Sequence, residues 1–139
     1  MKDVKVQDSK LITIPKIVAA DGHGNLSVIE KDILPYPVKR VYYLYDIPSD
    51  ATRGGHAHKE LWQFLIAVSG SFDVILDDGN ERKRFVLNRP YTGLLIPNGL
   101  WRELENFSSG AVCLSLVSDV YKESDYIRDY EEFKSHKNN

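Results

Sequence analysis

Two histidines that lie two positions apart, His56 and His58, are the residues of this chain best suited to chemistry. On an extended strand, residues i and i+2 project from the same face, so both imidazoles would point the same way. Gln63 follows after four intervening residues in an otherwise apolar run, and Arg102 follows a Pro-Asn-Gly turn farther along. An imidazole takes up and releases a proton near neutral pH, because its unperturbed pKa is about 6.5. These four side chains are the first candidates for a functional site.

The spacing of these residues resembles the two sequence motifs of the cupin superfamily. The first motif, HxH-x4-E-x6-G, is matched over residues 56–70, with Gln63 in place of the Glu. The second motif, PxG-x2-H-x3-N, is matched over residues 97–106, with Arg102 in place of the His. The resemblance implies a jelly-roll barrel in which the metal-ligand positions carry two histidines, a glutamine and an arginine.

This set of side chains disfavours a metal ion. A divalent cation takes neutral imidazoles together with an anionic carboxylate. Gln63 offers only a neutral carbonyl, and Arg102 brings a permanent positive charge that repels the ion. We therefore expect no metal and no other cofactor. A pair of half-buried strand histidines without function is the alternative, and the two preceding glycines and the polar Gln63 argue against it.

The composition limits the class of protein. The chain has 139 residues, enough for one domain spanning 1–139. Its net charge of -2, with 27% charged residues, gives no electrostatic indication of nucleic-acid binding. The lone Cys113 cannot form an intramolecular disulfide, and no apolar run approaches the roughly 20 residues of a membrane span. We expect a cytoplasmic protein that binds neither nucleic acid nor membrane.

The pattern of residues predicts an all-β fold. Short β-branched and aromatic runs separated by turn residues are typical of a sandwich or barrel. Pro15 interrupts the extended segment 11–20 and confines it to an edge or a crossover. At the C-terminus, aromatic residues at helical spacing and a possible cap at Ser124 predict a helix over 123–135. The expected strands are 26–30, 39–45, 61–68, 71–76, 82–87, 91–96, 101–107 and 111–118.

Two imidazoles and an arginine in an apolar barrel, without a metal, suit proton transfer. A carbon acid beside a ketone is the natural substrate, because cationic or phenolic donors can stabilise its enolate. Arg53, Arg102 and the tyrosines of residues 41–45 are candidate donors. By charge alone, the candidate phosphate contacts are Lys39, Arg40 and Arg82, for each of which a solvated surface role is the alternative.

A more specific resemblance covers residues 17–133. The chain resembles the cupin-type dTDP-4-keto-6-deoxyglucose 3,4-ketoisomerases, the WxcM-like group. This resemblance implies an enzyme that acts without metal on a dTDP-linked 4-keto-6-deoxy sugar, in the synthesis of 3-amino-3,6-dideoxy sugars for surface glycans. It also implies a homodimer that exchanges N-terminal strands, here residues 1–20. The matching segments are Lys39-Arg40-Val41-Tyr42-Tyr43, Arg53-Gly54, His56-Ala57-His58-Lys59, Gln63, Asp77-Asp78-Gly79, Trp101-x-Glu103 and Asp125-Tyr126-Ile127-Arg128.

The resemblance implies roles for individual residues. His58 would be the base that removes the C3 proton and returns it at C4, and His56 would assist it. Arg53 and Tyr43 would face the sugar or the diphosphate. The remaining substrate-binding candidates are His23, Arg40, Gln63 and Arg102.

The configuration of the product at C4 depends on which face receives the proton. In the family, Arg at the position of Arg102 accompanies a gluco product, so we expect dTDP-3-keto-6-deoxy-D-glucose rather than the galacto form. His23 is a titratable group that weakens this expectation if it reaches C4. Two alternatives stay open from the sequence: a related nucleotide-sugar epimerase, and a non-catalytic sugar-binding cupin.

Overall fold

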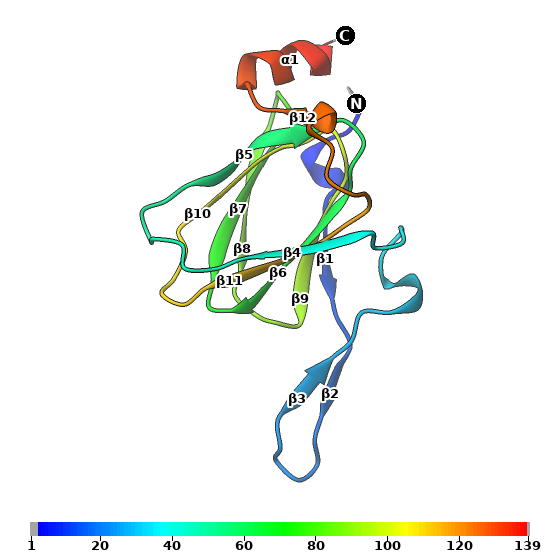
Figure 1. Ribbon diagram of the computed structural model, residues 1–139, viewed down its shortest axis with the longest axis vertical. Coiled ribbons are helices and arrows are strands. Elements are labelled where there is room, and N and C mark those ends of the chain that lie inside the picture. The colour runs from blue at the N-terminus through cyan, green and yellow to red at the C-terminus, as the bar shows by residue number, and fades with distance from the viewer. Residues whose placement is uncertain (1–2, 139) are drawn as a thin grey trace.

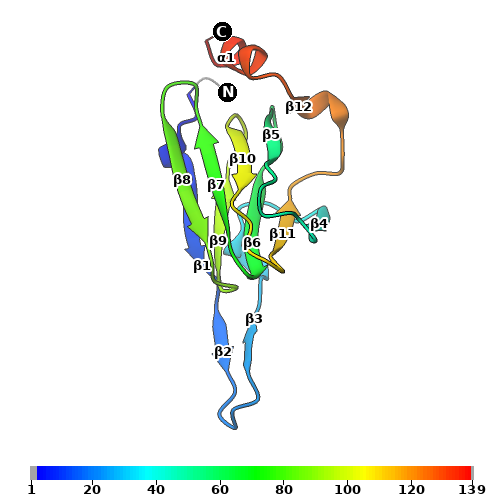
Figure 2. The same cartoon turned by 90° about the vertical axis from the view of Figure 1, so that its left-hand side faces the viewer.

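Two antiparallel five-stranded sheets face each other in the computed structural model, which describes residues 3–138 (Figures 1 and 2). Residues 1–2 and 139 of the predicted domain lie outside the described part. The first sheet has the order β1 (Lys10–Thr13), β9 (Thr92–Ile96), β6 (Gln63–Ser69), β11 (Val112–Val117) and β4 (Arg40–Leu44). The second has the order β12 (Tyr126–Ile127), β5 (Arg53–His58), β10 (Trp101–Glu105), β7 (Phe72–Asp77) and β8 (Arg82–Leu87). The predicted all-β fold with a short C-terminal helix is confirmed.

The core fills the space between the sheets. Because side chains alternate along a strand, every second residue points inward, as in β11, where Cys113, Ser115 and Val117 are buried. A second apolar cluster covers the outer face of the first sheet, beneath Ile14 and Leu34. The inward-facing core includes Leu65, Ala67, Phe72, Val74, Leu76, Leu94, Ile96, Leu104 and Phe107.

The N-terminal extended segment divides at Pro15. β1 pairs with β9 of the same chain, whereas β2 (Lys16–Val18) and β3 (Asn25–Ser27) form a separate hairpin. Figures 1 and 2 show this hairpin projecting from the barrel at the end opposite to the C-terminal helix. Proline lacks the N–H of a ladder bond, which is why the strand breaks there.

The C-terminal helix is shorter and later than predicted. α1 spans Tyr130–Asn138, whereas the sequence predicted a helix over 123–135. Tyr126 and Ile127 form β12 instead, because antiparallel pairing with β5 buries Ile127 completely. Asp129, rather than Ser124, precedes the helix as its cap and accepts a hydrogen bond from the Glu132 backbone N–H at 3.0 Å.

The helix packs on the outer face of the second sheet. Phe133 is fully buried against Trp101, with ring centroids 5.8 Å apart. Lys137 donates hydrogen bonds to the carbonyls of Val4 (2.6 Å) and Gly99 (3.2 Å), which joins the helix to the N-terminal segment. Within residues 3–138, no helix has the length and apolar character needed to cross a membrane.

Candidate active site

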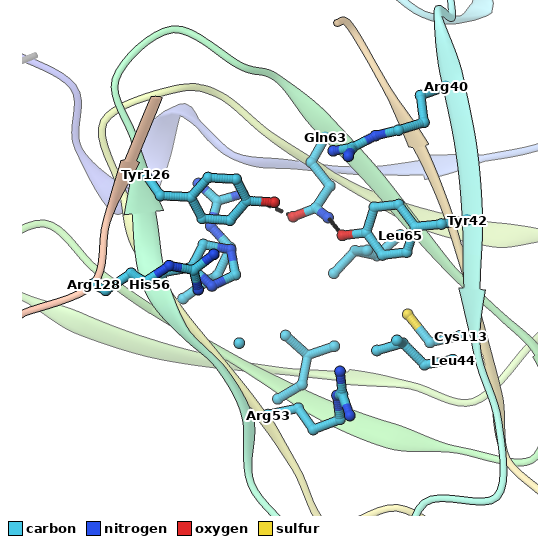
Figure 3. A pocket seen from close by; sticks show the side chains of 13 residues that line it. Arg40, Tyr42, Leu44, Arg53, His56, Gln63, Leu65, Cys113, Tyr126 and Arg128 are labelled. Carbon is cyan, nitrogen blue, oxygen red and sulfur yellow. Dashed lines mark hydrogen bonds between the residues drawn. The ribbon is translucent and has the colours of Figure 1, made fainter. Parts of the chain in front are cut away.

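A cavity of about 330 Å³ lies between the two sheets (Figure 3). The strands carry its lining side chains inward by the same alternation that builds the core. Its apolar wall is formed by Leu44, Leu65, Leu104 and Cys113. Its polar lining consists of Arg40, Tyr42, Arg53, His56, Gln63, Arg102, Tyr126 and Arg128. No Asp or Glu of the described residues lines the cavity, so its fixed charge is positive.

The two histidines occupy different environments. His56 lines the cavity, and its Nε2 atom is buried without a hydrogen-bond partner in residues 3–138. His58 lies behind it, 1% exposed and outside the cavity lining. The two rings meet edge to face, with centroids 4.9 Å apart. Of these two histidines, His56 is therefore the one whose side chain lines the cavity.

Asp125 fixes the orientation of His58. The Nδ1–H of His58 donates to Asp125 Oδ2 at 2.9 Å, which determines the tautomer of the imidazole. The carboxylate also accepts hydrogen bonds from the backbone N–H groups of Glu60 (2.8 Å) and Leu61 (3.4 Å). Sequence reasoning assigned Asp125 only to the first turn of a helix. The available signal was its place in the matching segment Asp125-Tyr126-Ile127-Arg128.

Both histidines are held in the neutral form. Burial and, next, the Arg102 cation lower the pKa of His56 to about 3. The same two causes lower the pKa of His58 strongly, with the neighbouring His56 as a further contribution. A neutral imidazole is the form that accepts a proton, so the site favours general-base chemistry.

Arg102 and Gln63 form a buried hydrogen-bond network at the positions where the two cupin motifs carry metal ligands. Arg102, 1% exposed, donates to Gln63 Oε1 at 2.8 Å and to the Leu100 carbonyl at 3.0 Å. Gln63 Nε2 donates to Tyr42 Oη at 2.5 Å and to Ser115 Oγ at 2.8 Å. The Gln63 carbonyl is thus already used by a cation, and no cluster of three or more His, Cys, Asp or Glu able to hold a metal occurs within residues 3–138. These residues do not fit the metal centre that the two cupin motifs imply.

Arginines surround the rest of the cavity. The guanidinium of Arg40 lies over the rings of Tyr42 (5.3 Å) and Tyr121 (5.6 Å), and its Nε has no hydrogen-bond partner in the described chain. Arg128 lies over Tyr126 at 4.2 Å and is bound by Glu123 through hydrogen bonds of 2.7 and 2.9 Å. These cations suit an anionic ligand.

Besides His58, which lies behind the lining, two expected site residues are away from the cavity. Tyr43 is 60% exposed on the outer face of β4, because alternation along the strand turns Tyr42 inward instead. His23 lies between β2 and β3, where its side chain is 81% exposed and pairs with Asp21 at 2.8 Å. The structure brings the others to the site: Arg40, Arg53, His56, Gln63 and Arg102 line the cavity, with His58 behind it.

The fold and the cavity define a cupin-like protein, and comparison with known proteins gives the family. Residues 7–138 match the family model described as FdtA, WxcM-like, C-terminal. The curated TDP-4-oxo-6-deoxy-alpha-D-glucose-3,4-oxoisomerase of Aneurinibacillus thermoaerophilus is 43% identical over 130 residues, covering 93% of this chain and 92% of that protein. The chain belongs to the FdtA family of WxcM-like isomerases.

Solved structures agree with this assignment. A 3,4-ketoisomerase from Helicobacter canadensis is 44% identical with a TM-score of 0.91, over 95% of this chain and 98% of that one. A histidine-to-asparagine variant of the enzyme from Thermoanaerobacterium thermosaccharolyticum, in complex with TDP-4-keto-6-deoxyglucose, is 39% identical with a TM-score of 0.90, over 95% of each chain. An epimerase from Mycobacterium tuberculosis, 16% identical with a TM-score of 0.72 over 89% of this chain and 70% of that one, shares the fold.

Proposed function

We propose that this protein is a metal-independent 3,4-ketoisomerase that converts dTDP-4-keto-6-deoxy-D-glucose into a dTDP-3-keto-6-deoxyhexose. The observation that carries the proposal is the neutral His56 imidazole, which lines the cavity together with arginines and with no carboxylate of residues 3–138, and whose buried Nε2 has no hydrogen-bond partner among those residues. Such a cavity attracts a nucleoside diphosphate sugar and provides a base for its carbon acid. The names of the relatives support the same substrate.

The proposed base is His56 rather than His58. His56 faces the cavity, whereas His58 is buried behind it and donates its Nδ1–H to Asp125. His56 would take the C3 proton to give an enediolate and return the same proton to C4, while the hydroxyl proton of O3 moves to O4, so that C3 becomes the ketone and C4 the alcohol. The Arg102 cation, which lies beside both histidines, would stabilise the negative charge of the enediolate. Asp125 would orient His58, and the edge-to-face contact with His58 would hold the His56 ring in place.

We further propose the gluco product. Arg102 is a permanent cation that cannot deliver a proton near neutral pH, so His56 would both remove and return it on one face. The exposed position of His23 in its own chain supports this choice, because it keeps a second titratable group away from C4. The 3-keto group would then be a substrate for amination, as in the synthesis of 3-amino-3,6-dideoxy sugars.

The experiment is product analysis by proton NMR with dTDP-4-keto-6-deoxy-D-glucose in deuterium oxide. A 3-keto product would support the function, inversion of a ring carbon with the 4-keto group retained would support an epimerase, and binding without turnover would support a sugar-binding cupin. Large coupling between the protons on C4 and C5 would support gluco, and small coupling would contradict it.

Histidine variants test the assigned base. His56→Asn should lower turnover by about 10²–10⁴, the usual loss when a general base is removed. His58→Asn should lower it less, because that residue acts through His56. His136→Asn, on the exposed side of α1, is the matched control and should turn over at the wild-type rate. Near-normal turnover by His56→Asn would exclude it as the base.

A further inference from the structure

Glu123 forms a bidentate ion pair with Arg128, one of the arginines that line the cavity. The Nε and Nη2 atoms of Arg128 donate to the two carboxylate oxygens at 2.7 and 2.9 Å. Both side chains are more than half exposed, so Arg128 lies where the cavity meets solvent. A long exposed side chain samples many rotamers, and a bidentate contact restricts Arg128 to few of them. Glu123 therefore acts on a cavity residue from outside the lining.

A second contact places Arg128 beside the catalytic wall of the cavity. Its guanidinium lies over the ring of Tyr126, 4.2 Å from the centroid. The same ring packs against His56, with centroids 4.9 Å apart. Tyr126 is itself fixed by the pairing of β12 with β5. Figure 3 shows Arg128, Tyr126 and His56 on the same side of the cavity.

Tyr121 joins a second cavity arginine to this arrangement. Its hydroxyl donates to the Glu123 carboxylate, and its ring lies beneath the guanidinium of Arg40 at 5.6 Å. Arg40 begins β4 of the first sheet, whereas Arg128 follows β12 of the second, and Figure 3 shows them on different sides of the cavity. The buried Nε of Arg40 has no hydrogen-bond partner in residues 3–138. A buried donor of this kind is usually satisfied by a group outside the chain.

We propose that Glu123 and Tyr121 are positioning residues that hold Arg128 and Arg40 in place for the diphosphate of the substrate. Guanidinium groups bind phosphate oxygens through pairs of N–H donors, so two arginines match the two phosphate groups. The contact with Glu123 uses two of the five N–H donors of Arg128 and leaves others for a phosphate. This inference rests on the proposed ketoisomerase function, whose substrate is a nucleoside diphosphate sugar.

The charge of Glu123 makes its role decidable by experiment. Hydrogen bonds from Arg128 and Tyr121 lower the pKa of Glu123 to about 2, and Glu123 in turn raises the pKa of Arg128. Both groups therefore stay ionised near neutral pH. A carboxylate beside a diphosphate repels it, whereas a carboxylate that orders Arg128 favours its binding. Removing the charge of Glu123 strengthens binding in the first case and weakens it in the second.

The test measures binding of dTDP and of thymidine to the full chain by isothermal titration calorimetry. Glu123→Gln should weaken dTDP binding by about 3- to 5-fold and raise KM more than it lowers kcat. Thymidine binding should not change, because thymidine carries no phosphate. Glu131→Gln, 77% exposed on α1, is the matched control with wild-type binding. Unchanged or tighter dTDP binding by Glu123→Gln would overturn the proposal, since a carboxylate that merely masks Arg128 gives that result.

Two double variants separate positioning from a structural role. Arg128→Gln should weaken dTDP binding by about 10- to 100-fold, and adding Glu123→Gln should cause no further loss. A further loss would show that Glu123 acts without Arg128 and would contradict the proposal. The exchange Glu123→Arg with Arg128→Glu keeps an ion pair but puts a carboxylate at the cavity wall. It should unfold near the wild-type temperature and bind dTDP as weakly as Arg128→Gln. Wild-type binding by the exchanged pair would mean that the pair is merely structural.

Tyr121→Phe covers poor folding of the charge variants. It keeps the ring beneath Arg40 and removes only the hydroxyl that contacts Glu123. Thermal unfolding should stay near wild type, and dTDP binding should weaken by about 2- to 5-fold. Tyr45→Phe, 61% exposed, is its control, and wild-type binding by Tyr121→Phe would overturn the proposal. If wild-type protein binds dTDP but makes no 3-keto product, the proposed function fails, which is a distinct outcome.

Discussion

Arg102 donates to Gln63 across 2.8 Å, and this contact joins β10 of one sheet to β6 of the other inside the barrel. The two residues stand where cupins place a metal-binding His and Glu. The guanidinium of Arg102, held by hydrogen bonds, therefore takes the place of a metal ion held by ligands. A buried guanidinium without a contacting carboxylate is costly unless an anion meets it. In the proposed reaction, the enediolate would be that anion.

The acid limb of the pH–rate profile should lie well below the usual range for histidine. A base works when it is neutral, so activity is lost as pH falls through the pKa of His56, which is about 3. We expect kcat/KM to be nearly flat between about pH 5 and 7, whereas an unperturbed imidazole would titrate at about 6.5. Arg102→Met should move the limb upward by part of that difference, because burial, the larger cause, persists. A wild-type limb near 6.5 would contradict this.

The free energy of unfolding should decrease as the solution is acidified below about pH 6.5. An unfolded histidine binds a proton there, whereas folded His56 stays neutral down to about 3, so acid favours the unfolded chain. Each such histidine contributes a slope of about 1.4 kcal/mol per pH unit. Urea titrations between about pH 5 and 7 measure the slope, because most carboxylates titrate below that range. His56→Asn should reduce the slope, and His136→Asn should not.

Chelation should leave activity unchanged. The lining offers Gln63 and Arg102 where a metal would need a carboxylate and an imidazole, so purified protein should contain no stoichiometric transition metal. Activity measured before and after EDTA treatment, with metal analysis, tests this. Loss that zinc or iron restores would contradict it. The double variant Gln63→Glu with Arg102→His restores a ligand set and should bind zinc, which provides the positive control.

A homodimer is expected in solution. Ile17, Val18 and Leu26 of the β2–β3 hairpin are 58%, 64% and 57% exposed, and an isolated two-stranded hairpin is only marginally stable in water. Exchange of the N-terminal segment, expected over residues 1–20, with a second copy would bring the hairpin against that copy and cover these side chains. Light scattering should give twice the chain mass, and Leu26→Asp should shift the population to monomer while Val86→Asp, on an exposed face of β8, should not. A wild-type monomer at micromolar concentration would contradict the prediction.

Strand positions could be predicted because alternation and turn residues are local properties. The all-β class followed from them, whereas the expectation that Gln63 and Arg102 lie together came from the resemblance to the two cupin motifs. The helix over 123–135 was wrong because Tyr126 and Ile127 have helical spacing with Tyr130 yet gain more from pairing with β5, a partner distant in sequence. Pairing between strands that are distant along the chain leaves no signal in the local sequence.

The site was harder to predict than the fold. Choosing Tyr43 over Tyr42 was a shift of one position, and on a strand one position moves a side chain to the opposite face. The different environments of His56 and His58 depend on Asp125, which contacts His58 from the C-terminal segment. His56 and His58, two positions apart on one strand, look equivalent in the sequence. The position of Asp125 is what distinguishes them.

The hydrogen bond from Lys137 to the Val4 carbonyl brings the two ends of the described chain together. A short linker between the termini could therefore close the chain into a ring without crossing the cavity, and an exposed turn such as Ser109-Gly110 offers a place to reopen it. The fold and its site then do not depend on the order of the strands along the chain. A circularly permuted form with its new ends at that turn would carry the same barrel and the same histidines.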